Sequence, residues 1–198
     1  MKTSIKSLIA MVCTTMTLTA TYPNNLCAAE KSKTTFLKIQ NFRRIVINGN
    51  IEVMLVQQPR VGVSYADDNK GTVKVIQQGE VLRLTNSDTE KCKLIIYVND
   101  IYRIEASQNA VLKTEVKLST KFLQVILKDN AIADINTSSE GLYTEILDNS
   151  TLKLKGNTNH HALVMGKTPN LTINGFVSVK TDVRRVETAD EQIAALAL

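Results

Sequence analysis

His160 and His161 are the only histidines of this 198-residue chain, so proton transfer or metal binding by imidazole would have to use them. Adjacent side chains in a strand point to opposite faces, and the pair could share a metal only in an irregular loop. No Cys or carboxylate stands at a ligand spacing beside them. We interpret the pair as a polar corner between Gly156 and a strand over residues 162–165. We expect no metal and no other cofactor.

Paired carboxylates are the second candidate, because two of them can cleave polysaccharides by acid and base chemistry. Asp67 and Asp68 stand beside Asn, Lys and Gly, where Asp is expected for turn formation. Asp134 and Glu145 fall at outward positions of neighbouring segments and could face solvent along one sheet. The chain has no nucleophile elbow, phosphate loop or zinc pattern. We predict that it is not an enzyme, and a glycan-active β-helix enzyme stays open as the less favoured alternative.

Residues 1–29 are typical of an export signal. Lys2 and Lys6 precede a mostly apolar stretch over residues 8–18, and Cys27-Ala28-Ala29 offers a cleavage site after Ala29. The apolar stretch is shorter than the ~20 residues that span a bilayer, so we expect no transmembrane segment in the mature chain. Residues 30–198 then form one domain in the periplasm, on the cell surface or outside the cell.

Cys92 is the single cysteine after residue 29, so no internal disulfide is expected. It lies between two lysines, whose charge would lower a thiol pKa, but no His is near it in sequence. We interpret it as an incidental residue of a polar loop. The net charge of +5 includes Lys2 and Lys6, and no basic cluster alternates with aromatic residues, so nucleic acid binding is not expected.

A period of two runs through most of the chain and predicts half-buried β-strands. Between Thr34 and Arg185 there is no sustained helical period. A short loop with Gly79 joins two alternating runs, which predicts a hairpin and some antiparallel pairing in the N-terminal portion. The alternating apolar residues are Ile45, Ile47, Ile51, Val53, Leu55, Val61, Val63, Tyr65, Leu82, Leu84, Val116, Leu118, Leu123, Val125 and Leu127.

A sequence pattern for a corner followed by a strand occurs three times. The copies align on Asn109, Asn130 and Asn149, with spacings of 130 − 109 = 21 and 149 − 130 = 19. Residues at odd offsets from each Asn are mostly apolar and are expected to face inward. Asn50 and, more loosely, Phe176 fit the same register. Asn and Asp, including Asp129 and Asp148, suit such corners because they tolerate left-handed backbone. Calcium binding by these two aspartates is disfavoured, because no Asp-rich nonapeptide pattern is present.

Units of about 20 residues indicate repeat architecture. We predict an all-β fold, a right-handed parallel β-helix-like solenoid with some antiparallel strands in its N-terminal portion. Thr188 and Glu191 form a capping box, and Ile193 and Leu196 share a face, which predicts a short helix over residues 188–198. We expect this helix to cover the end of the solenoid, with docking to another protein as the rival role.

Most of the chain from Phe36 to Lys180 resembles the head GIN domain family of auto-transporter adhesins, a Bacteroidetes-type exported domain, and the later strand-and-corner repeats resemble the C-terminal half of that domain. The resemblance rests on FRRIVINGNIEV from Phe42, on Gln57-Gln58, on the acidic turn Asp67-Asp68-Asn69 and on GEVLRL from Gly79. The chain departs from the family where Asp-Asn-Ala or Asp-Asn-Ser replaces glycine-rich corners, and in its expected C-terminal helix. The resemblance implies an exported β-helix-like domain of the cell envelope.

We therefore predict a non-enzymatic, adhesin-like or scaffolding role through an extended sheet surface. The expected partner is a protein or a glycan surface. A self-associating envelope subunit is the alternative, and it would show an exposed apolar strip near Ile95 and Tyr97 or an uncovered edge strand.

Overall fold

The structure, a computed structural model, describes residues 36–66, 73–166 and 170–186, all within one compact unit that spans residues 32–198. These ranges contain thirteen strands and no helix, which confirms the all-β class. The strands are β1 (Phe36–Leu37), β2 (Arg44–Gly49), β3 (Ile51–Gln57), β4 (Gly62–Tyr65), β5 (Lys74–Gln78), β6 (Val81–Asn86), β7 (Cys92–Val98), β8 (Arg103–Ser107), β9 (Val111–Thr114), β10 (Leu118–Leu127), β11 (Ile132–Ile146), β12 (Thr151–Met165) and β13 (Asn170–Arg185).

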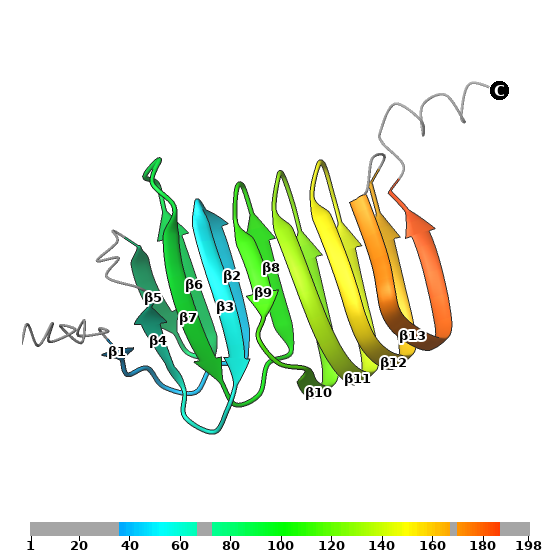
Figure 1. Cartoon of the computed structure of the whole chain (residues 1–198), viewed down its shortest axis with the longest axis horizontal. Helices are drawn as coiled ribbons and strands as arrows, with labels where there is room; N and C mark the ends of the chain where they lie inside the picture. Colours follow the sequence, from blue (N-terminus) through cyan, green and yellow to red (C-terminus); the bar gives the residue numbers. More distant parts are fainter. Residues whose placement is uncertain (1–35, 67–72, 167–169, 187–198) are drawn as a thin grey trace, which may run out of the picture. The chain divides into compact units, whose positions relative to one another are not determined.

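The last four strands, β10 to β13, stack in parallel in the order of the sequence (Figure 1). Leu118 of β10 lies opposite Thr137 of β11, and Ile132 of β11 lies opposite Thr151 of β12. These two steps each advance the chain by 19 residues, from 137 − 118 and from 151 − 132, whereas the step from β12 to β13 changes from 19 (173 − 154) to 20 (176 − 156) at a register shift. The first part of β11, up to Asp134, pairs with β9, whereas its second part pairs with β10. A long strand thus contributes to two layers of the stack.

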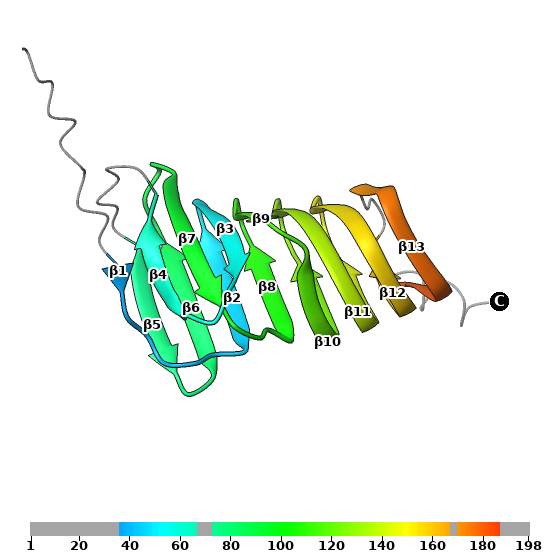
Figure 2. The same ribbon diagram turned by 60° about the horizontal axis from the view of Figure 1, so that its bottom comes forward.

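The N-terminal strands do not stack in sequence order. β2 lies between β6 and β8, and β3 lies between β7 and β9, all in parallel (Figure 2). Beyond β6 and β7 the pairing becomes antiparallel, with β4 against β7, β1 against β4 and β5 against β6. Gly79 has a φ of 57° in the tight turn between β5 and β6. The hairpin and the antiparallel pairing predicted for this portion are confirmed.

Inward side chains of the two layers meet in one hydrophobic core. Alternate residues of β2 and β3 are fully buried, as the period of two predicted: Ile45, Ile47, Ile51, Val53 and Leu55. Toward the C-terminal strands the core takes up polar side chains: Thr137, Ser139, Thr144, Thr158 and His161. Thr137 donates to the carbonyl of Leu118 at 3.1 Å, and Ser139 donates to Thr158 Oγ1 at 3.1 Å. These hydrogen bonds compensate for the loss of water around buried hydroxyls.

Two interpretations of chemistry-bearing residues are wrong. His160 and His161 lie inside β12 and not at a corner, because parallel pairing with β11 and β13 continues through both positions. Cys92 opens β7 and is 2% exposed, so it does not belong to a polar loop. Burial raises the pKa of its thiol, which keeps the sulfur protonated and unreactive.

One register expectation is also wrong, and another fits only in part. Val116 does not alternate inward with Leu118, since it precedes β10 and is 47% exposed. Phe176 differs from the three Asn corners, because it lies within β13 opposite Gly156, where the pairing with β12 shifts register, and not in a turn between two strands. Asn50 does fit, since β2 and β3 stack on β8 and β9 with a common offset of 59, from 107 − 48 and from 111 − 52.

Several sequence-based expectations lie outside the described residues. They concern the export signal over residues 1–29, the acidic turn at Asp67 and Asp68, and the helix over residues 188–198 with Thr188, Glu191, Ile193 and Leu196. The helical part of the fold prediction is not supported by the described ranges, which are entirely strand, turn and loop. None of their residues lies in a helix long and apolar enough to cross a membrane.

Candidate ligand-binding site

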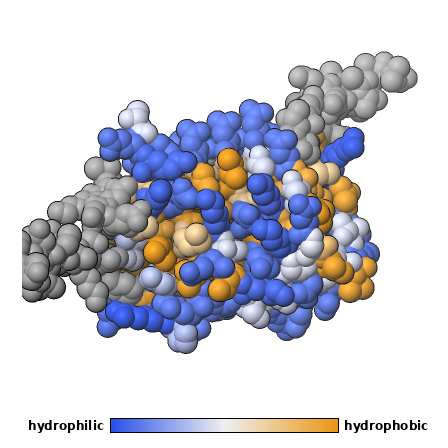
Figure 3. Space-filling view, viewed as in Figure 1, coloured by the Kyte–Doolittle hydropathy of each residue, from blue (hydrophilic) through white to orange (hydrophobic). Residues whose placement is uncertain are grey.

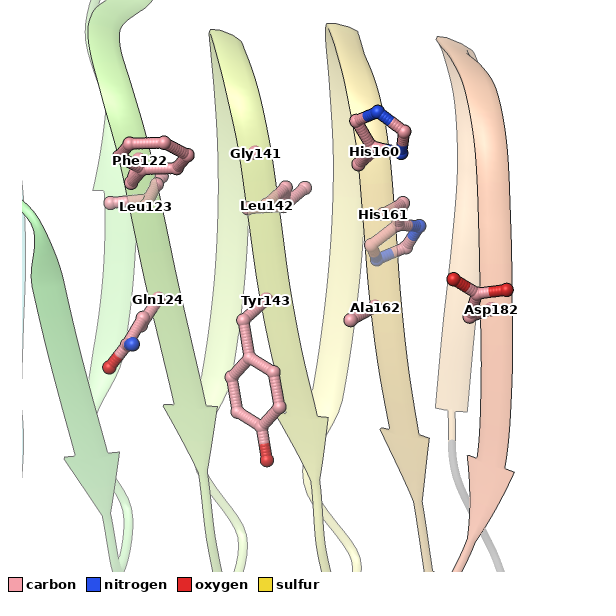
Figure 4. Close-up of a pocket in the computed structure, with 10 residues that line it drawn as sticks. All are labelled: Phe122, Leu123, Gln124, Gly141, Leu142, Tyr143, His160, His161, Ala162 and Asp182. Atoms are coloured by element: carbon pink, nitrogen blue, oxygen red, sulfur yellow. The ribbon is translucent and has the colours of Figure 1, made fainter.

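The outward side chains of β10 to β13 form two rows that cross the stacked strands. The first row follows the register Phe122, Gly141, His160 and Lys180. The second row follows Gln124, Tyr143, Ala162 and Asp182. Parallel pairing brings together residues that are 19 positions apart between β10, β11 and β12, and 20 positions apart between β12 and β13, where the register shifts after Leu154. Figure 4 shows both rows, without Lys180, at two successive levels of the same strands.

A hollow of about 290 Å³ lies between these rows. It exists because Gly141 and Ala162 are small where their neighbours Phe122, Tyr143 and His160 are large. The Phe122 ring approaches β11 so closely that a Cβ added at Gly141 would lie 2.8 Å from its Cδ1. Even so, Phe122 is 58% exposed, so much of the ring remains open to solvent.

Charged and hydrogen-bonding groups border the hollow. Tyr143 donates from its hydroxyl to Glu145 Oε2 at 2.9 Å. Burial, and then this bond, raises the pKa of Tyr143, so the phenol stays neutral. Arg103 donates from Nη1 to Gln124 Oε1 at 3.3 Å, which orients the amide. Lys180 and Asp182 form an exposed salt bridge of 3.4 Å at the far edge.

His161 forms part of the floor and points inward, opposite to His160. It is 2% exposed, its Nε2 is 2.8 Å from Thr144 Oγ1, and its ring meets the Phe176 ring edge-on at 5.3 Å between centroids. Burial lowers the pKa of this imidazole, so it is neutral at pH 7. The buried histidine therefore serves packing, and only His160 of the pair can meet a ligand.

The predicted corner residues lie at the ends of the strands, outside the hollow. Asn109, Asn130 and Asn149 are exposed in turns, but the left-handed residues are those just before them: Gln108, Asp129 and Asp148, with φ from 56° to 60°. The Gln108 N–H donates to Asp129 Oδ2 at 2.9 Å, and the Asp129 N–H donates to Asp148 Oδ2 at 3.0 Å. Each corner carboxylate thus satisfies a backbone group of the preceding corner.

The carboxylates considered for catalysis are not brought together. Asp134 lies in the first part of β11 and accepts from Lys155 at 3.3 Å, whereas Glu145 lies in the second part beside Tyr143. Among the described residues, no group of three or more His, Cys, Asp or Glu could hold a metal ion. The geometry of the hollow is suited to holding a ring by contact and hydrogen bonding.

Sequence reasoning missed Phe122 and Tyr143 as site residues. The signal was present, since each is an aromatic residue on the polar, outward parity of its strand. Gly141 stands 19 residues from both Phe122 and His160, which is one step of the stack (141 − 122 and 160 − 141). The register was needed to see that these three are neighbours.

Residues 41–195 match the family described as "putative auto-transporter adhesin, head GIN domain". The chain belongs to this family. The resemblance stated from Phe42 onward is thereby confirmed. The description of the family names an auto-transporter adhesin. None of the curated proteins with which the chain was compared matches it.

Solved structures similar to this head GIN domain support the fold. An adhesin from Parabacteroides merdae, described as putative, has a TM-score of 0.55 at 15% identity and covers 77% of this chain and 76% of its own. A second such adhesin, from Parabacteroides distasonis, has a TM-score of 0.58 at 11% identity and covers 77% of both chains. A "putative lipid binding protein" from Parabacteroides distasonis has a TM-score of 0.55 at 8% identity, covering 77% and 78%.

Proposed function

We propose that this chain is an exported, non-enzymatic, adhesin-like domain of the cell envelope, which binds a glycan in the hollow beside Phe122. The observation that carries the proposal is the 58% exposed Phe122 ring held across Gly141 on an otherwise polar sheet face. An exposed aromatic ring loses apolar contact with water on binding and offers a rigid stacking surface. The family description is consistent with such a role.

The size of the hollow and the polar groups at its border favour a sugar ring. Pockets for small molecules begin near ~300 Å³, and the 290 Å³ hollow is of the size that one ring fills. The C–H groups on one side of a sugar ring carry partial positive charge and are attracted to the face of an aromatic ring. Gln124, His160 and Asp182 border the hollow and can bond hydroxyl groups. An acyl chain would need a deeper, enclosed tunnel, so lipid binding of the kind named for one structural neighbour is less suited to it.

The proposal includes the architecture and the location predicted from sequence. We propose that the strands wind as a right-handed β-helix-like solenoid, supported by the steps of 19 and 20 residues in the parallel pairing between β10 and β13. We further propose that residues 1–29 are removed on export. Terminal sequencing of the protein recovered from its own cells is expected to begin at Glu30, and a start at Met1 would contradict export through this signal.

The function is tested by binding of the chain from Glu30 onward to a glycan array, followed by calorimetry with the best-bound sugar. Phe122→Ala is expected to weaken binding by about tenfold or more, equivalent to about 1.4 kcal/mol. Ile132→Ala is the matched control. Like Phe122, Ile132 is an exposed apolar residue, but it lies in the first part of β11, away from the hollow. Equal binding by the Phe122 variant, or no binding to any sugar, would overturn the proposal.

A further inference from the structure

The inward side chains of β13 continue the rows of the core but are not covered by a further strand among the described residues. One row of the register runs through Val125, Thr144, Leu163 and Val183. The first three of these are 0%, 0% and 4% exposed, whereas Val183 is 55% exposed. In another row, Leu154 of β12 is 0% exposed and its partner Ile173 of β13 is 48% exposed. The last strand thus presents side chains of core type that a further strand would cover.

The edge of β13 is long and is paired on one side. Within the described ranges β13 pairs only with β12, over 16 residues of strand. In the space-filling view, apolar groups gather at the end of the stack where β13 lies (Figure 3). A long edge with apolar side chains is a template for another strand, because its backbone groups and its apolar surface are satisfied together.

The charges on the outward side of β13 indicate which strand fits. Lys180, Asp182 and Arg184 alternate in sign along this face. A parallel copy in register would place each charge opposite its like. In an antiparallel copy centred on Thr181, Lys180 lies opposite Asp182 of the second copy, and the reverse pair forms by symmetry. In this register the two copies of β13 overlap over most of the second part of the strand, from Phe176 to Arg185.

We propose that a second copy of this chain pairs antiparallel with β13, with the two-fold axis near Thr181. The salt bridge between Lys180 and Asp182 within one chain is exposed on both sides, 61% and 63%, and contributes little, so each group can turn to the second copy. The pairing covers Val183 and removes the open edge along the second part of β13. The inference rests on β13 alone and does not depend on the proposed glycan binding.

The pairing has a consequence for the hollow. Because the axis passes through the sheet, both copies present the rows of Phe122 and Tyr143 on the same face. The two hollows then lie about four strand spacings apart, or ~20 Å across the strands. A two-site face of this kind binds a surface with repeated ligands more tightly than one site alone.

The test is the size of the full mature chain in solution, measured by sedimentation over a range of concentrations without any sugar. We expect a dimer, at least tenfold weaker dimerisation in Asp182→Lys, and recovery in the double variant Lys180→Asp with Asp182→Lys. Glu140→Lys is the control, since Glu140 is similarly exposed on β11 and away from the edge. Circular dichroism checks that each variant is folded.

Three outcomes would overturn the inference. The first is a monomer at every concentration, and the second is a dimer that Asp182→Lys leaves unchanged. The third is a full chain that stays monomeric while a chain ending at Val186 dimerises, which would show that residues 187–198 occupy the edge instead. Loss of glycan binding with an intact dimer would contradict only the proposed function.

Discussion

At its N-terminal end the stack finishes in short antiparallel strands, whereas at its C-terminal end β13 continues the parallel pattern over 16 residues. The N-terminal, closed end buries Val63 (0% exposed) and Val73 (7%), and its most exposed large apolar residues, Leu37 and Ile76, are only 37% and 36% exposed. The C-terminal, open end leaves the inward residues Ile173 at 48% and Val183 at 55% exposed. Both ends face the same difficulty, an edge of unpaired backbone groups.

The difference shows two ways of finishing a stack of strands. β1 has two residues and β5 has five, and short strands of reversed direction do not offer a template for continued parallel pairing. β13 keeps the parallel direction of the strands before it, with one register shift against β12 after Leu154, and therefore keeps their capacity to pair. The closed end therefore stops further strand pairing, whereas the open end can pair with another strand.

The largest difference in lost unfolding free energy is expected between Ile96→Ala at the closed end and Ile173→Ala at the open end. Ile96 is 0% exposed between β3 and β4, and its truncation should cost about 2–5 kcal/mol through a buried cavity. Ile173 is 48% exposed, so its truncation should cost less than about 1 kcal/mol in dilute, monomeric protein. Urea unfolding measures both. Equal losses would mean that the end formed by β13 is already covered in the monomer.

A second comparison uses two left-handed glycines near the open end. Gly156 has a φ of 100°, and an added Cβ would lie 2.0 Å from the Thr137 carbonyl oxygen, whereas Gly175 has a φ of 70° and open space around it. Gly156→Ala should cost about 3 kcal/mol and Gly175→Ala about 1 kcal/mol. Because contacts are made mostly between neighbouring strands, hydrogen exchange should rise in β12 and β13 and stay slow in β3 and β7. A uniform rise would contradict this separation of the two ends.

The corner carboxylates are expected to contribute less to the free energy of unfolding than the buried core residues and Gly156. Asp129→Ala removes the acceptor for the Gln108 N–H and places alanine at a φ of 58°, so we expect a loss of about 1–2 kcal/mol. Asp129→Asn keeps an oxygen acceptor and a residue that tolerates left-handed backbone, so its loss should be below about 0.5 kcal/mol. Thermal unfolding of the two variants, measured side by side, compares the two losses of stability. A large loss in the Asn variant would show that the charge itself is needed.

The smallest effect is a dependence of stability on pH near the open end. The pKa of His161 is lowered by burial below its ordinary value of 6.5, so the unfolded chain binds the proton more readily than the folded one. The stability from neutral His161 is complete above that ordinary value and decreases as pH falls below it. Urea midpoints at pH 7.5 and 5.0 should differ less in His161→Gln than in the wild type. His160→Gln, at an exposed position, should keep the full difference.

Alternation along the chain was sufficient to place most strands, because an inward residue of β2 or β3 is apolar whatever its partner strand is. It failed at Cys92 and at His160 with His161, where polar residues suggested loops inside continuous strands. There the pairing with neighbouring strands outweighs local composition. Phe122, Gly141 and His160 form the candidate site only through the 19-residue register, which joins positions on three strands.

The amino-acid sequence alone decided the strand class, the spacing of the corners and the side of each strand that faces the core, because side-chain alternation and turn chemistry are local properties. Only the tertiary structure decided that residues 44–57 lie between residues 81–98 and 103–114, and that one end of the stack is closed and the other open. Strand order depends on contacts between distant segments, and every parallel neighbour offers the same backbone pattern. The choice among such neighbours is made by packing of the whole core.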